Sequence, residues 1–190
     1  DSVTMYQLQD GSWQDEDPNA GAYTPPSGGT GGGGGTYQPP APPSTPGSWS
    51  TDSSLAGMEV HIYTPNSTTI NGQRALMIAL HGCSQPNEVV RDNWGWENEA
   101  DEYGMVVVAP MAPNGGVGPN CWDYYDSGHS AANPGRHDDN LIDLAETLIA
   151  DSNLNIDPDQ VYISGLSSGG GETFVMGCVA REIFAGIGIK

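Results

Sequence analysis

The chain has 190 residues, and its 24 acidic and 5 basic side chains give a formal net charge of −19 at pH 7. Such a charge repels nucleic acids and anionic lipids, so neither is an expected partner. No apolar run of about 18 residues is present, which excludes a membrane-spanning helix. An acidic surface suits an extracellular or saline setting, and it equally suits simple solubility.

Residues 1–48 are predicted to be a Gly/Pro-rich tail or linker rather than part of a core. They include the stretch SGGTGGGGGTYQPPAPPSTPGS, whose glycines favour flexibility and whose prolines favour extended chain. The tail as a whole also has scattered aromatic residues that could alternatively dock on a surface, namely Tyr6, Trp13, Tyr23 and Tyr37. Residues 49–190 are then expected to form the folded domain.

Three strands are predicted first in this domain. Residues 58–64, MEVHIYT, alternate apolar and polar as a half-exposed strand does. Residues 75–80 (ALMIAL) and 105–110 (MVVVAP) are continuously apolar, which is typical of parallel strands covered on both faces. A helix is predicted between them, over residues 93–103.

The next elements complete an alternating pattern. Residues 138–152 form an amphipathic helix with acids in its first turn, and NIDPDQ (155–160) is predicted to turn the chain. Residues 161–164 (VYIS) make a short strand, and residues 172–180 read as helix. Strands alternating with helices predict a right-handed, mostly parallel α/β sheet with flanking helices.

The sequence GLSSG (165–169) matches the pattern G-x-S-x-G between a predicted strand and a predicted helix. A serine at such a corner needs strained backbone and small neighbours, which the glycines supply. Ser167 is therefore the candidate nucleophile. A plain glycine-serine turn is the alternative, and the flanking strand and helix argue against it.

Two backbone amides are candidates for an oxyanion hole. The Ser168 amide begins the helix after the nucleophile, and the Cys83 amide lies in the loop that follows residues 75–80. His81 precedes the nucleophile and lies in that loop, where an imidazole more often supports the backbone than transfers a proton.

The segments LHGCSQ, NCWDYYD, VYISGLSSGGG and FAGIGI resemble extracellular polyhydroxybutyrate depolymerases and related polyester or feruloyl esterases. The resemblance covers about residues 48–189 and implies an α/β-hydrolase fold. It implies that Ser167 attacks the ester, that Ser168 and Cys83 form the oxyanion hole, and that Trp122 and His81 lie at the substrate cleft. It also implies a secreted enzyme that needs no metal and no organic cofactor.

The three cysteines fit no zinc pattern, so one disulfide and one spare thiol are expected. The resemblance implies a bond between Cys83 and Cys121, although Cys121 alone could be a small buried side chain. Cys178 would then be left to associate with a carboxyl-terminal segment outside this sequence.

In α/β-hydrolases the catalytic acid and histidine follow the nucleophile along the chain. The residues after Ser167 hold Glu172 and Glu182 but neither Asp nor His, so we expect both partners on a segment absent from this sequence, which reads as truncated after the nucleophile helix. The four histidines all precede the serine: His61, His81, His129 and His137. His137 adjoins Asp138 and Asp139, which are better explained as helix caps than as a dyad.

The favoured hypothesis is a secreted serine esterase acting on a polyester such as poly(3-hydroxybutyrate). Hydrolases of oxidised polyvinyl alcohol and feruloyl or acetylxylan esterases use the same machinery and remain alternatives. Aromatic residues available for an apolar substrate are Trp94, Trp96, Trp122, Tyr124 and Tyr125. A non-catalytic binding or structural fragment is the alternative from another class.

Overall fold

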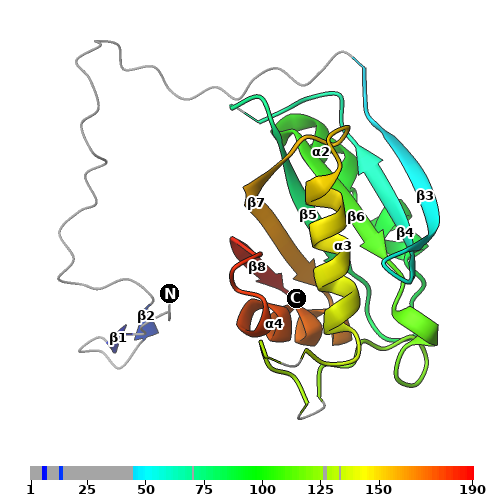
Figure 1. The fold of residues 1–190 in the computed structure, drawn as a ribbon, viewed down its shortest axis with the longest axis vertical. Helices are drawn as coiled ribbons and strands as arrows, with labels where there is room; N and C mark the ends of the chain where they lie inside the picture. The colour runs from blue at the N-terminus through cyan, green and yellow to red at the C-terminus, as the bar shows by residue number, and fades with distance from the viewer. Residues whose placement is uncertain (1–5, 8–12, 15–44, 70, 126–127, 133) are drawn as a thin grey trace. The chain divides into compact units, whose positions relative to one another are not determined.

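The computed structural model describes residues 6–7, 13–14, 45–69, 71–125, 128–132 and 134–190. The chain divides into two compact units, residues 1–38 and 39–190. In the first unit, β1 (Tyr6–Gln7) and β2 (Trp13–Gln14) pair antiparallel. Most of the predicted tail, including its glycine run, lies outside the described residues. All other elements belong to the second unit (Figure 1).

A six-stranded mixed sheet forms the centre of the second unit, in the order β3-β4-β6-β5-β7-β8. Strands β5, β6, β7 and β8 pair in parallel, whereas β3 with β4 and β4 with β6 pair antiparallel. The strands are β3 (Ser48–Leu55), β4 (Met58–Thr64), β5 (Arg74–Leu80), β6 (Met105–Pro110), β7 (Ile156–Gly165) and β8 (Gly186–Ile189).

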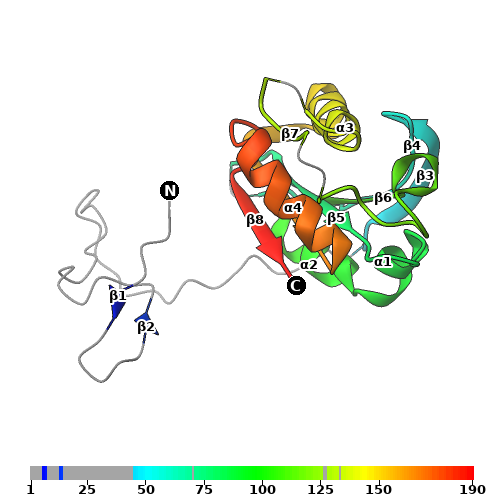
Figure 2. The ribbon, with the colours of Figure 1, turned by 90° about the horizontal axis from the view of Figure 1, so that it is seen from below.

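Helices cover both faces of this sheet. Figure 2 shows α3 (Asp138–Ala150) and α4 (Ser168–Val179) on one face, with α1 (Glu88–Asn93) and α2 (Trp96–Tyr103) on the other. A short 3₁₀ turn, Pro113–Gly115, follows β6. This arrangement confirms the predicted α/β class, because parallel strands joined by helical crossovers need covering on both sides.

The core explains why β5 and β6 read as unbroken apolar runs. Along β5, Leu76, Ile78 and Leu80 belong to the core beneath α3 and α4. The intervening Ala75 and Ala79 pack on the opposite side of the sheet, in the clusters that include residues of α1 and α2. Alternate residues thus serve different layers, and five of the seven residues of β5 are buried.

The structure differs from the sequence predictions at three places. β3 carries mostly exposed polar side chains and has no apolar pattern, yet its backbone pairs with β4 at the edge of the sheet. The expected turn at residues 155–160 is largely the start of β7, which pairs with β5 through a register irregularity. The helix expected over 93–103 is largely α2, which begins at Trp96 after Gly95 with φ of 70°, and α1 before it was not predicted.

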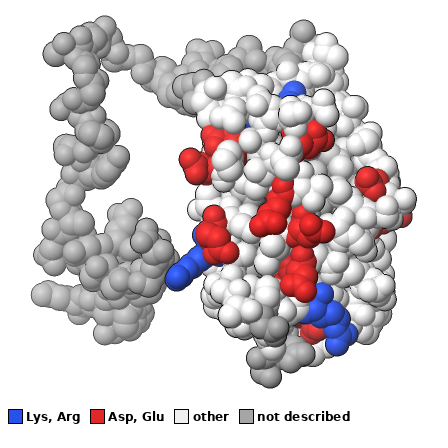
Figure 3. Space-filling model, in the orientation of Figure 1, with Lys and Arg blue, Asp and Glu red and all other residues white. Residues whose placement is uncertain are grey.

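The surface of α3 carries several acids. Asp139, Asp143 and Glu146 are all exposed on this helix. Figure 3 shows carboxylates gathered along the middle of this face, with few basic groups among them. Among the described residues, no helix is long and apolar enough to cross a membrane.

Candidate active site

Three chain segments meet at the carboxyl edge of the parallel strands. One follows β5 and contains residues 81–87, a second follows β6, and the third is the bend between β7 and α4. Because β5 lies between β6 and β7 in the sheet, the segments after these strands are brought together at one edge. This edge is where open α/β sheets place their functional groups.

Ser167 occupies the bend itself. Its backbone has φ of 56° and ψ of −115°, its side chain is exposed, and α4 begins at the next residue. A positive φ is unfavourable for a residue with a Cβ, so the surrounding structure must hold it. Its amide donates to the Lys190 carbonyl oxygen at 3.0 Å, and the Leu166 amide donates to the Leu80 carbonyl oxygen at 3.1 Å.

The glycines around the bend are required by close backbone approach. A Cβ on Gly165 would overlap the backbone of Gly169, and one on Gly169 would overlap the carbonyls of Leu80 and His81. A Cβ on Gly82 would lie 3.4 Å from the Cβ of Ser167. The loop after β5 therefore lies directly against the bend that carries the serine.

The Cys83 and Ser168 amides are available as hydrogen-bond donors. Neither donates to any group in the part of the chain that the structure describes. The loop around Cys83 is fixed by its neighbours, because the Gly82 amide donates to Oε1 of Gln85 at 2.8 Å and Ser84 adopts a φ of 61°. The Ser168 amide also stands at the positive end of a helix, which favours a developing negative charge.

A disulfide joins Cys83 to Cys121, as the resemblance implied. Beside it, the Ser84 amide donates to the Pro119 carbonyl oxygen at 2.6 Å. The segment after β6 is thereby tied to the loop after β5 by one covalent bond and one hydrogen bond. Cys178 is a free cysteine on the surface.

Trp122 lies in the core of this structure, and its place near the substrate cleft stays a prediction. The residue is 0 % exposed and belongs to the main core. Its ring lies 5.5 Å from that of His81 and 5.7 Å from that of His137. The neighbouring disulfide ties this part of the chain to the loop after β5, and a large aromatic ring gains much from burial.

His81 is likewise buried, and its place at the substrate cleft also stays a prediction. Its Nδ1 donates to the Gly82 carbonyl oxygen at 2.9 Å, and its Nε2 accepts a hydrogen bond from the Ala112 amide at 3.1 Å. Burial lowers the pKa of His81, which keeps the ring neutral with its proton on Nδ1. The ring joins the loops after β5 and β6, the supporting role that was favoured over proton transfer.

The remaining histidines also have partners other than Ser167. Nδ1 of His137 accepts from the Asp123 amide at 3.0 Å, so this ring is not paired with Asp138. Asp138 instead binds Nδ1 of His129 at 2.8 Å and accepts from the Gly135 amide. Sequence reasoning missed the pair of His129 and Asp138, because the loop between them has no periodic pattern that would indicate contact.

Glu172 is an unusual buried acid on α4. It is 0 % exposed, and its two carboxyl oxygens and Oδ1 of Asp138 have no hydrogen-bond donor among the described residues. Burial first, and then the nearby Asp138 carboxylate, raise the pKa of Glu172 to about 9. A proton on Glu172 supplies the missing donor to Asp138 and links α4 to the start of α3.

Exposed aromatic rings and a cavity flank the bend. Tyr124 and Tyr125 are exposed, and the ring of Tyr124 packs against Gly171 of α4. A cavity of about 560 Å³ lies beside Leu166 and is lined partly by Trp94 and Trp96. The cavity lining includes neither Ser167 nor the two candidate oxyanion residues, so the bend is the better candidate for chemistry.

Comparisons with known proteins agree on one family. The family model described as esterase PHB depolymerase matches residues 58–190. Over 160 residues the chain is 42% identical to a poly(3-hydroxybutyrate) depolymerase of Ralstonia pickettii, covering 76% of this chain and 32% of the relative. It is 33% identical over 131 residues to a bifunctional acetylxylan esterase/xylanase of Neocallimastix patriciarum, covering 68% and 17%. The chain thus spans a third or less of these relatives.

Solved structures agree on the fold. An acetyl xylan esterase from Aspergillus awamori superposes with a TM-score of 0.62 at 23% identity, over 75% of this chain and 51% of that one. The strand order, the helices on both faces and the bend at Ser167 are those of an α/β-hydrolase. The chain belongs to the PHB depolymerase family of esterases and has an α/β-hydrolase fold, as its sequence motifs implied.

Proposed function

We propose that this chain is the nucleophile-bearing part of a secreted serine esterase and that it cleaves the ester bonds of a polyester such as poly(3-hydroxybutyrate). One observation carries the proposal: Ser167 is an exposed serine with positive φ, between β7 and the amino terminus of α4. The similarity to a Ralstonia pickettii depolymerase supports the polyester as substrate. The disulfide supports an oxidising, extracellular setting.

In the proposed reaction, Oγ of Ser167 bonds to the ester carbonyl carbon and its proton passes to a base. The Cys83 and Ser168 amides stabilise the oxyanion, and collapse of this intermediate releases the alcohol and leaves an acyl-serine. Water then attacks the acyl carbon, which releases the acid and restores the serine. Loss of one oxyanion donor costs about 3 to 4 kcal/mol of transition-state stabilisation in comparable enzymes.

The base is proposed to lie outside the described residues. Each of the four histidines is buried or nearly so and has a hydrogen-bonding partner other than Ser167. Glu172 is fully buried, so it is not placed to accept a proton from the exposed hydroxyl of Ser167. We therefore expect the acid and histidine of the triad on the part of the full-length protein that this chain does not span.

Acetylxylan ester hydrolysis is the second candidate, because it is named for several relatives, including enzymes of Neocallimastix patriciarum and Aspergillus ficuum. Full-length protein should be assayed on hydroxybutyrate oligomers, acetylated xylan, feruloyl sugars and β-diketones, with Ser167→Ala as the control. The proposal predicts that hydroxybutyrate esters give the highest kcat/KM and that the variant loses this activity. A higher kcat/KM for acetylated xylan would instead support the second candidate function, acetylxylan ester hydrolysis.

A further inference from the structure

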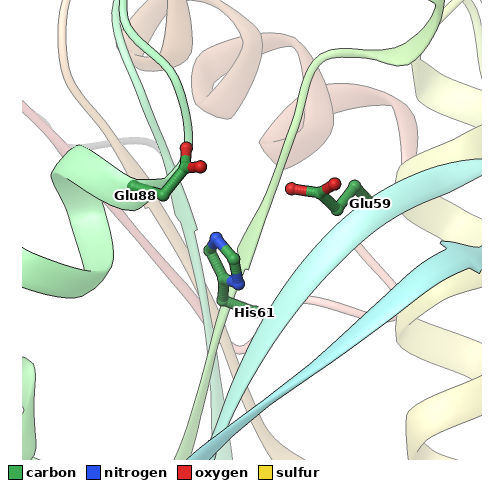
Figure 4. A group of neighbouring side chains, drawn as sticks. All are labelled: Glu59, His61 and Glu88. Carbon is green, nitrogen blue, oxygen red and sulfur yellow. The ribbon is translucent and has the colours of Figure 1, made fainter.

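Three side chains with metal-ligating atoms converge on the sheet face that α1 covers. Glu59 and His61 are two residues apart on β4 and so lie on the same face of the strand, and Glu88 is the first residue of α1. One ligand atom from each residue lies within 4.8 Å of the other two. Figure 4 shows the imidazole standing between the two carboxylates, one from the strand and one from the helix.

The imidazole of His61 is held in a fixed orientation. The residue is only 3 % exposed, and its Nδ1 lies 2.8 Å from Oγ1 of Thr51, its partner on the neighbouring strand β3. When Nδ1 donates its proton to that hydroxyl, Nε2 carries the lone pair of the ring, which accepts a long hydrogen bond from Nη1 of Arg91 in this structure. A hydrogen bond from the second ring nitrogen is the usual support for a metal-binding histidine.

The charge around His61 is not balanced by the protein. Neither the Glu59 nor the Glu88 carboxylate has a hydrogen-bond or ion-pair partner within the described parts of the chain. Arg91 is the nearby cation, with Nη1 3.4 Å from Nε2 of His61, but its guanidinium is bound to Asp92 at 2.6 Å. Three carboxylates thus face one guanidinium, which leaves two negative charges uncompensated.

The backbone beneath the three side chains is also fixed. The Glu59 carbonyl oxygen accepts from the Met111 amide at 2.8 Å and from Nδ2 of Asn87 at 3.3 Å. Nδ2 of Asn87 also donates to the Ala109 carbonyl oxygen at 3.1 Å. The start of α1 is thereby fastened to β4 and β6, so the ligand atoms converge without a large rearrangement.

We propose that Glu59, His61 and Glu88 bind a divalent transition-metal ion of the Zn²⁺ type. One imidazole nitrogen and two carboxylate oxygens are ligands that Zn²⁺ accepts, with water in the fourth position. Ca²⁺ and Mg²⁺ prefer six or more oxygen ligands and are disfavoured by the imidazole. The site departs from the expectation that no metal is bound, and because it links β4 to α1 it would stabilise the fold rather than act on the ester.

The test is calorimetric titration of metal-free protein with Zn²⁺, together with thermal unfolding with and without the ion. Wild-type protein should bind Zn²⁺ and unfold at a higher temperature in its presence, because a ligand of the native state stabilises it. His61→Gln and Glu88→Gln should each weaken binding by about tenfold or more, and Thr51→Val by roughly tenfold. Arg91→Gln should tighten binding, because its guanidinium competes for Nε2.

Glu146→Gln is the matched control, since it removes an exposed carboxylate on α3, away from this group. It should leave Zn²⁺ affinity unchanged. His61 is buried, so His61→Gln can perturb folding. Glu88 is partly exposed on α1, so Glu88→Gln should leave the fold intact and tests metal binding by itself. Equal Zn²⁺ binding by wild type, His61→Gln and Glu88→Gln would overturn the proposal, as would no binding by the wild type or equal competition by Ca²⁺.

Discussion

The Trp122 amide donates a hydrogen bond to Oγ of Ser168, with 3.4 Å between the two atoms. This bond joins the segment after β6 to the first residue of the nucleophile helix. The adjacent Cys121 is bonded to Cys83, so the same segment also reaches the oxyanion loop. Residues 121 and 122 therefore connect the two residues whose amides are the candidate oxyanion donors, Cys83 and Ser168.

Removing the disulfide should destabilise the protein. The bond closes a loop with a sequence separation of 38, for which chain entropy predicts a loss of about 3 to 4 kcal/mol in Cys83→Ala. Urea denaturation measures the loss. Cys178→Ala is the control, and it should change the free energy of unfolding by less than about 0.5 kcal/mol, because its side chain is exposed and free.

Substitutions at Trp122 and Tyr125 should change the free energy of unfolding by different amounts, because one side chain is buried in the core and the other is exposed. Trp122→Ala should lower the free energy of unfolding by about 3 to 5 kcal/mol, because the ring is fully buried. Tyr125→Ala should change it by less than about 0.5 kcal/mol, since that side chain is 67% exposed. If the two variants were equally stable in denaturant, the buried position of Trp122 would be wrong.

The glycine at the start of the nucleophile helix should not tolerate a methyl group. Gly169→Ala places a Cβ on the carbonyls of Leu80 and His81, so a loss of about 1 to 3 kcal/mol is expected from overpacking. Gly177→Ala in the same helix meets only the side chain of Ile187. Alanine has a higher helix propensity than glycine, so Gly177→Ala should leave the free energy of unfolding nearly unchanged or raise it. Thermal unfolding of both variants provides the comparison.

Glu172 should make stability depend on pH. Its pKa is raised to about 9 in the folded protein from an ordinary value of 4.5, so the folded state favours the protonated acid. The stabilisation is complete below about 4.5 and is lost progressively as the pH rises through about 9, because the unfolded chain ionises first. Denaturation of wild type and Glu172→Gln across this range should show a slope in the difference between them. A difference independent of pH would mean that Glu172 is ionised when folded.

Much of the fold could be predicted because its signals are local. The apolar run at residues 105–110 coincides with β6, and the run at 75–80 forms all but the first residue of β5. Covering on both faces produces such runs, so pattern and structure share one cause. β3 gave no such signal, because an edge strand can be stabilised by backbone pairing while its side chains face water.

The candidate site was predictable only in part. The bend at Ser167 follows from a local motif, whereas the surroundings of Trp122 and the contact of His129 with Asp138 depend on how distant segments pack. The ligating group around His61 was also missed, because Glu88 comes from a different element and no short motif joins it to β4. Residues that are close in space but have no fixed spacing along the chain produce no sequence pattern from which their contact could be predicted.

Labelling of the full-length protein with a fluorophosphonate, followed by peptide mass spectrometry, tests directly whether Ser167 is the nucleophile. We expect one adduct, on Oγ of Ser167, that is lost in Ser167→Ala and retained in Ser168→Ala. Ser168 is the matched control because its hydroxyl is buried and accepts the Trp122 amide. An unlabelled protein, or an adduct that persists in Ser167→Ala, would contradict the assignment of Ser167 as the nucleophile.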